Sequence, residues 1–130
     1  MKTIFFFFFL IIFPLAINAQ TESNKSQGTA TEIRPIDSTE YELIVSDAEF
    51  ENWLITNSRP VWYHENDYYR FKNRLYVVNW NNRVRQAMYR PPYDYEIEYD
   101  PSVDYGVEVN WKLYWYFKYL EQKLGIDLGT

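Results

Sequence analysis

The feature that most limits the fold is the N-terminal apolar run Ile4–Ala16, because it is the most hydrophobic segment and we expect the folded domain to lack it. Lys2 precedes the run and the small residue Ala19 follows it, which is the arrangement of a secretory signal peptide. The run is shorter than the roughly 20 residues that a membrane-spanning helix needs. We therefore predict a signal peptide over residues 1–19, and export through the inner membrane to the periplasm or out of the cell.

Without this segment, the domain has few aliphatic residues from which to build a core. The chain contains 13 Tyr and five Trp, and all of them lie after the predicted signal peptide. Such rings bury large areas, while the hydroxyl or the indole N–H seeks a partner or water. Two alternatives follow. The rings form the core of a small domain, or some of them stay exposed and stack on a sugar or on another chain.

Composition excludes several classes of function. The chain has no cysteine, so disulfides, zinc–thiolate sites, a cysteine nucleophile and a lipidated N-terminus are impossible. The net charge of −5 argues against nucleic acid as a partner, because phosphate binding needs a basic face. His64 is the only histidine and offers no pair for zinc. We expect no cofactor and no membrane-spanning segment after the signal peptide is removed.

The rest of the chain divides into a leader and one domain. Residues 20–39 are predicted to be a flexible leader, because they can bury too little apolar surface to offset the entropy lost on ordering. Residues 40–126 are predicted to form a single small α+β domain, with three helices and one or two short strands. Its first strand is expected at Tyr41–Val45, where β-forming residues predominate.

The first helix is predicted directly after this strand. Ser46 and Glu49 have the spacing of a capping box, with Ser46 as the N-cap. The apolar residues Phe50, Trp53 and Leu54 follow at helical spacing, so the helix is expected to continue to about Asn57.

A second helix is predicted from about Glu65 to Met88. Four apolar residues form one stripe at helical spacing, which is typical of an amphipathic helix: Tyr68, Phe71, Leu75 and Val78. A basic stripe on a neighbouring face includes Arg70, Arg74 and Arg85.

The third helix, about Val107 to Leu124, is the clearest element of the sequence. Its expected core stripe is Val109, Leu113, Phe117, Leu120 and Leu124, and Gly125 suits the position after its C-terminus. The opposite face carries Trp111, Tyr114, Trp115 and Lys118 rather than plain charges. A helix that is apolar all round is either enclosed or presents a contact surface. We interpret this face as a candidate contact site for a protein or glycan of the cell envelope, and cover by a neighbouring element is the alternative.

Between the last two helices, Asp94–Asp100 alternates carboxylates with Tyr or Ile, which predicts a half-buried strand with an acidic face. With two later carboxylates, this acidic face comprises Asp94, Glu96, Glu98, Asp100, Asp104 and Glu108. Because the preceding helix is basic, we expect the two blocks to fold against each other. An acidic pocket for a cation or a basic ligand is the functional alternative. The spacing does not match a calcium-binding loop, so no metal site is predicted.

These patterns favour a non-enzymatic interaction module. A carbohydrate-binding module is an alternative, because it would use the same exposed rings. A glycan-acting envelope enzyme is another, with two of the carboxylates between Asp94 and Glu108 as its acid and base. No nucleophile elbow surrounds Ser58 or Ser102, so a Ser–His mechanism is not supported.

The sequence also resembles a family of small exported proteins of Bacteroidota over about Glu40 to Ile126. The matching residues are Tyr41–Val45 with Phe50 and Trp53, Asn73-Arg74, Trp80-Asn81, Tyr99–Gly106, Asn110, Tyr114 and Tyr116–Tyr119. Members often carry a lipidation cysteine, which this chain lacks. The family is a domain of unknown function, so the resemblance implies no catalytic residues and no ligand. It does imply that the segment Asp100–Gly106 matters for the fold or for binding.

Overall fold

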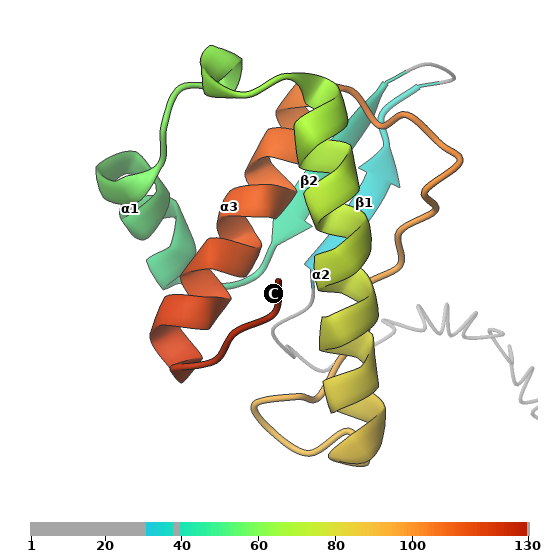
Figure 1. The fold of residues 1–130 in the computed structure, drawn as a ribbon, viewed down its shortest axis with the longest axis vertical. Coiled ribbons are helices and arrows are strands. Elements are labelled where there is room, and N and C mark those ends of the chain that lie inside the picture. The colour runs from blue at the N-terminus through green and yellow to red at the C-terminus, as the bar shows by residue number, and fades with distance from the viewer. Residues whose placement is uncertain (1–30, 38–39, 130) are drawn as a thin grey trace, which may run out of the picture.

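The computed structural model describes residues 31–37 and 40–129. The predicted signal peptide 1–19 and residues 20–30 of the predicted leader lie outside the described residues. The described elements form a small α+β domain, as the sequence predicted (Figure 1). In chain order they are β1 (Thr31–Pro35), β2 (Tyr41–Val45), α1 (Ala48–Asn57), the short 3₁₀ helix η1 (Val61–Tyr63), α2 (Asn66–Gln86) and α3 (Val107–Leu124).

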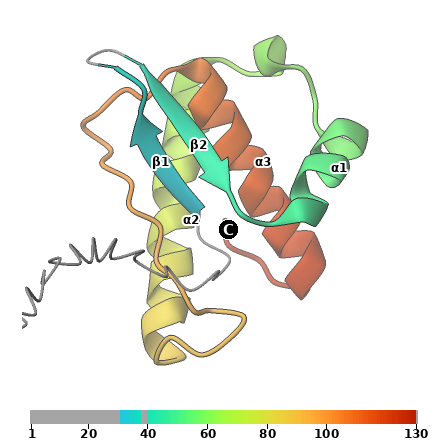
Figure 2. The same cartoon turned by 180° about the vertical axis from the view of Figure 1, so that it is seen from behind.

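The central element of the domain is α3. It packs against α2, α1, β2 and η1, and the hairpin β1–β2 covers one side of the α2–α3 pair (Figures 1 and 2). The opposite side of α2 has no described element in front of it (Figure 1).

The hairpin confirms the strand predicted at Tyr41–Val45 and adds a second strand. The two strands are antiparallel, with Thr31 opposite Val45 and Pro35 opposite Tyr41. The first of them lies inside the range 20–39, where the sequence predicted a flexible leader, so that expectation is corrected for Thr31–Pro35. Backbone hydrogen bonds to β2 hold this strand although it has few apolar side chains. One of those side chains, Ile33, also packs against the core.

The first helix begins one residue later than the predicted capping box implies. Asp47, not Ser46, is the N-cap, because its Oδ1 accepts a hydrogen bond from the backbone N–H of Glu49 at 3.0 Å. A side-chain oxygen that accepts from the first turn is what an N-cap supplies. Asp47 is preferred here because tertiary contacts from α3 also hold its carboxylate.

The helix α2 confirms the second prediction but has two apolar faces. The buried face consists of Tyr69, Asn73, Tyr76, Val77, Trp80 and Val84. The stripe that indicated the helix lies on the solvent side, where Phe71 is 52 % exposed and Val78 is 54 % exposed. Tyr68 and Leu75 of the same stripe are exposed too. The pattern therefore predicted the helix correctly, although its apolar residues lie on the exposed face of α2 and not on the face that packs into the core.

The end of α2 adopts a specific capping motif. Tyr89 N–H donates to the carbonyl of Val84, and Met88 N–H donates to the carbonyl of Arg85. These two bonds define a Schellman motif, in which the residue after the cap takes a left-handed conformation and is usually glycine. Here that residue is Met88, with φ of 52°.

The segment Asp94–Asp100 is not a strand, which corrects the prediction. The sheet in the described residues contains β1 and β2 alone. Side chains of α2 form the hydrogen bonds to the backbone of this segment that a neighbouring strand would otherwise form. Asn81 accepts from the N–H of Ile97 at 2.8 Å and donates to its carbonyl at 2.9 Å, and the Trp80 indole donates to the carbonyl of Tyr95 at 2.9 Å. The alternation is still real, because Ile97 is buried while the flanking Glu98 is exposed.

The third helix has the predicted bounds and core. Val109, Leu113, Phe117 and Leu120 are buried, and Leu124 packs at the edge of the core. Gly125 follows in a left-handed conformation with φ of 64°, as the sequence predicted. Within residues 31–37 and 40–129, no helix combines the length and the hydropathy needed to cross a membrane.

Candidate functional site

The aromatic residues predicted to share a face of α3 do lie together, but other parts of the chain cover most of that face. The Trp111 indole donates to the carbonyl of Arg59 at 2.7 Å, and Trp115 lies 6.3 Å from the Trp53 ring of α1. Tyr114 is buried among the rings of α2, and the Lys118 ammonium lies 5.6 Å from its centroid. Most of this face is therefore occupied by contacts within the chain, and Trp111 and Trp115 remain half-buried.

The acidic face and the basic stripe meet at one ion pair among the described residues. Arg85 lies 2.6 Å from Glu96, whose carboxylate also accepts a hydrogen bond from Tyr89 at 2.7 Å. Arg70 instead donates to the carbonyl of Pro101 at 3.4 Å, and Arg74 lies over the Phe71 ring. Asp94, Glu98 and Glu108 are exposed. The two blocks thus pair at one end of α2, as expected, rather than along its whole length.

Three carboxyls of the acidic face have a lowered pKa. The Tyr89 hydroxyl lowers the pKa of Glu96, hydrogen bonds from Ser102 lower that of Asp100, and the Gly106 N–H with the Asn66 amide lowers that of Asp104. A glycosidase needs one carboxylic acid with a raised pKa to protonate the leaving group. Each of these three shifts runs the other way, so Glu96, Asp100 and Asp104 do not suit the role of the acid.

The segment Asp100–Gly106 is held by a network of asparagines. Asp104 accepts from the Asn66 amide at 3.2 Å, and Asn66 in turn accepts from Asn110 at 2.9 Å. The buried Asn73 donates to the carbonyl of Asn110 at 2.8 Å. The chain then enters α3 through Gly106, whose φ of 90° suits glycine. These contacts give the segment a structural role. Asn73 and Asn110 are among the residues that carry the family resemblance, but no shared spacing in the sequence indicated that they bond to each other or to Asn66.

A hollow of about 550 Å³ lies beside this segment. It is lined by Ile33, Tyr41, Glu98, Tyr99, Asp100, Pro101, Val103 and Tyr105. Its rings pack together, since the centroid of Tyr105 lies 4.9 Å from that of Tyr41 and 5.2 Å from that of Tyr99. Rings beside exposed carboxylates are a combination that can hold a sugar, because the rings stack on its apolar face and the carboxylates accept from its hydroxyls.

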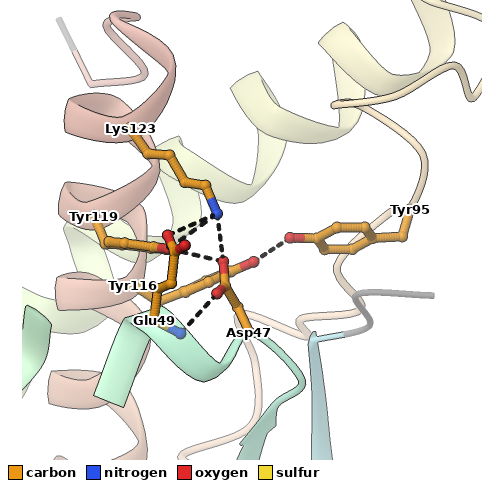
Figure 3. Close-up of polar contacts among 6 residues, drawn as sticks. All are labelled: Asp47, Glu49, Tyr95, Tyr116, Tyr119 and Lys123. Atoms are coloured by element: carbon orange, nitrogen blue, oxygen red, sulfur yellow. Dashed lines mark hydrogen bonds and ion pairs between the residues drawn. The ribbon is translucent and has the colours of Figure 1, made fainter. Parts of the chain in front are cut away.

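A polar cluster joins α1, α3 and the chain between α2 and α3 (Figure 3). Lys123 Nζ lies 2.9 Å from Asp47 Oδ2 and 3.6 Å from Glu49 Oε2, and the Tyr119 hydroxyl donates to Asp47 at 2.8 Å. The hydroxyls of Tyr95 and Tyr116 are hydrogen-bonded to each other.

The charge states of this cluster give it a structural role. The hydrogen bond to Asp47 raises the pKa of Lys123, and burial raises the pKa of Tyr119. Lys123 is therefore charged and Tyr119 protonated at neutral pH. Neither is poised as a base or nucleophile, since those roles need a lowered pKa in a lysine or tyrosine.

Six of the eleven exposed large hydrophobic residues in the described part of the chain lie on η1 and on the solvent side of α2. We call this surface the η1–α2 strip. It consists of Trp62, Tyr63, Tyr68, Phe71, Leu75 and Val78. Trp62 is 81 % exposed. The rings continue from η1 to α2 through His64, whose centroid lies 4.8 Å from that of Tyr63 and 3.9 Å from that of Tyr68.

Three cations border the η1–α2 strip. Arg59 lies 5.7 Å from the Tyr63 centroid, Lys72 lies 5.9 Å from that of Tyr68, and Arg74 lies 5.9 Å from that of Phe71. Cations over ring faces are attracted by the ring quadrupole. The strip is therefore an apolar surface with a basic border, although the chain as a whole is acidic.

A family profile described as "Family of unknown function (DUF6146)" matches residues 5–130. The chain belongs to this family. The match confirms the expected membership of a domain of unknown function, whereas the Bacteroidota origin and the export of the protein stay predictions. Comparison with curated proteins found no match, and comparison with solved structures found none either.

For this member of the DUF6146 family, the sequence contained one signal for the strip that our interpretation did not use. Residues 66–86 carry two apolar stripes at helical spacing, one through Phe71 and Leu75 and one through Tyr76 and Trp80. A single helix on the surface of a small domain needs only one such stripe for the core. The second stripe is the indication of a contact surface. Trp62 lies outside any periodic pattern and had no comparable signal.

Proposed function

We propose that this protein is an exported, non-enzymatic interaction module, and that the η1–α2 strip binds a protein partner. The observation that supports this most directly is the exposure of Phe71, Leu75 and Val78 beside a core that other residues of α2 already fill. Contiguous apolar surface of this kind is typical of a contact site. Export is supported by the apolar run Ile4–Ala16 and its flanking residues.

The border of the strip defines the chemistry of the partner. Arg59, Lys72 and Arg74 are placed to meet carboxylates at the edge of a contact, while the rings between them meet apolar side chains. Complementary charges at the rim of an interface guide association and fix its orientation. The partner surface is therefore an apolar patch with at least one carboxylate beside it.

Site-specific crosslinking in the producing cells tests the contact. A photoreactive phenylalanine analogue at position 71 is expected to give a protein adduct, which Leu75→Glu should abolish. The matched control is the same analogue at position 55, because Ile55 is 83 % exposed on α1 and lies outside the strip. Equal adduct yields at the two positions, or an adduct that survives Leu75→Glu, would reject the strip as the binding surface.

Export is tested separately, by the mass of the N-terminal peptide in each cell fraction. A protein that begins at Gln20 in the periplasm or the medium is the expected result. An uncleaved chain confined to the cytoplasm would contradict export.

Carbohydrate binding is a second candidate, favoured by the tyrosine-lined hollow beside Asp100–Gly106. Titration with a panel of soluble oligosaccharides is the test. Tyr41→Ala should abolish any binding there and Glu98→Gln should weaken it, whereas Tyr63→Ala, outside the hollow, should not. Binding that is unaffected by Tyr41→Ala would exclude the hollow.

A further inference from the structure

We infer that the partner of the η1–α2 strip is a second copy of this chain, paired through antiparallel α2 helices about a two-fold axis. This inference rests on the proposed function, because it uses the same surface. It specifies which residues meet and in which orientation, so it can fail while the proposed function stands.

The charges at the two ends of α2 specify the orientation. Asp67 lies in the first turn, and Arg83 and Arg85 lie in the last. Asp67 and Arg85 are separated by five turns of an ideal helix, so they lie on one line along its surface. A two-fold axis that passes beside α2 at the level of Tyr76, midway between them, places Asp67 of each copy beside Arg85 of the other. A parallel arrangement would instead place Asp67 on Asp67 and Arg85 on Arg85.

Both charged side chains are exposed to solvent. The side chain of Asp67 is 92 % exposed, and its contact with Arg70 within the chain is long, at 3.8 Å. The side chain of Arg85 is 62 % exposed, although it also pairs with Glu96. Because the symmetry makes every contact occur twice, the interface would contain two Asp67–Arg85 pairs.

The apolar residues between the charges fit the same axis. Phe71 and Val78 lie on the face shared by Asp67 and Arg85, and Leu75 lies beside it, close to the axis. In the antiparallel arrangement Leu75 meets Leu75 of the second copy, and Phe71 lies against the surface between Val78 and Asn82 of that copy. Antiparallel pairing also aligns opposite ends of the two helix dipoles. The outer position of α2 leaves this face open to a second molecule (Figure 1).

Sedimentation equilibrium of the purified protein over a range of concentrations is the first measurement. We expect a monomer–dimer equilibrium that Phe71→Glu and Leu75→Glu shift to monomer. Ile55→Glu is the matched control, since it also places a charge at an exposed apolar position and should leave the dimer intact. Circular dichroism of each variant checks that the fold is retained.

Charge reversal tests the orientation. Asp67→Arg alone and Arg85→Asp alone should each weaken the dimer by roughly tenfold, since each variant replaces two attractive contacts with two repulsive ones. An equimolar mixture of these two variants should form a heterodimer, because both contacts between positions 67 and 85 then join an arginine to an aspartate. This rescue does not depend on how either substitution affects the monomer, since each variant is also measured alone.

Three results would overturn the inference. The wild type remains monomeric at every concentration, or Leu75→Glu leaves a dimer intact, or the mixed charge variants fail to form the heterodimer. A monomeric protein whose position-71 adduct contains a different polypeptide rejects self-pairing but retains the proposed function. A monomer that floats with anionic lipid vesicles, and loses this property with Leu75→Glu, would assign the strip to a membrane surface and reject both proposals.

Discussion

Lys123, near the end of α3, lies 2.9 Å from Asp47, and the same carboxylate caps the first turn of α1. One aspartate therefore completes a local helix terminus and also joins two helices that are far apart in the sequence. The charge that favours the N-terminus of α1 is held by the cation near the C-terminus of α3, and both positions suit the respective helix dipoles.

Asp47→Ala is expected to lower the free energy of unfolding by about 2 kcal/mol, at the upper end of the cost of losing an N-cap. The hydrogen bond from Tyr119 is lost as well. Urea denaturation measures the change. Ser46→Ala, at the position where the sequence placed the cap, should stay within about 0.5 kcal/mol of wild type. Equal effects of the two substitutions would contradict the assignment of the cap.

Acid should weaken the fold through Asp47 and Asp104. Burial of Asp47 opposes its ionisation, but the hydrogen bonds from Lys123 and Tyr119 outweigh this and lower its pKa. The Gly106 N–H lowers the pKa of Asp104. A carboxyl whose pKa is lower in the folded state stabilises the protein above its unfolded pKa, and this contribution is lost as the pH falls through the folded pKa. Thermal unfolding should therefore show a falling Tm below about pH 4, with a shallower fall in Asp47→Asn.

Asn81→Ala should cost about 2 kcal/mol, because it leaves the buried backbone of Ile97 without its two partners. Hydrogen exchange at the Ile97 amide should accelerate more than at amides of α3. The neighbouring Asn82 is exposed, so Asn82→Ala serves as the control. Unchanged exchange at Ile97 in the Asn81 variant would contradict the view that this side chain replaces a strand.

Met88→Gly is expected to stabilise the protein by about 0.5–1 kcal/mol, because a left-handed conformation is costly for a residue with a β-carbon. Met88 is exposed, so little packing is lost. Gly125 has the same position at the end of α3, with open space around it. Gly125→Ala should therefore destabilise the protein by a similar amount. Thermal unfolding of both variants checks the pair, and shifts of the same sign would contradict the argument.

Trp62 should account for most of the tryptophan fluorescence that acrylamide quenches. It is 81 % exposed, whereas Trp80 is fully buried and the other three tryptophans are half-buried. Trp62→Phe should therefore reduce the Stern–Volmer slope more than Trp111→Phe or Trp115→Phe does. The opposite order would indicate that the exposed aromatic surface lies on α3, which the sequence left as one of two alternatives.

The sequence predicted the elements whose signals are local. The bounds of α3 and its glycine terminus follow from periodicity and capping, and Tyr41–Val45 follows from composition. The strand Thr31–Pro35 could not be predicted in the same way, because its pairing with β2 comes from the backbone. The alternation in Asp94–Asp100 indicated an extended chain with one buried side. Alternation does not indicate whether the backbone of such a segment pairs with another strand or, as here, with the side chain of an asparagine.

The candidate site was harder to predict than the fold. Periodicity identifies faces of a helix but does not say which face the rest of the chain will cover. For α3 the aromatic face turned out to be largely enclosed, through contacts such as that between Trp111 and the carbonyl of Arg59. For α2 the decisive contacts come from residues distant in sequence, such as Asn110 and Tyr95. Those partners become visible only when the chain is folded.

Two apolar faces on one helix create an ambiguity that the folding chain has to resolve. Rotation of α2 by about half a turn would offer α3 a second apolar surface, so hydrophobicity alone discriminates poorly between the two packings. The amide nitrogen of Asn73 and the indole N–H of Trp80 break this near-degeneracy, because each donates to a backbone carbonyl that it meets in one rotation only. These side chains specify the orientation of the helix, as single buried polar residues specify the register of coiled coils. The hydrogen bonds of Asn73 and Trp80 thus decide which apolar face of α2 joins the core and which remains exposed to solvent.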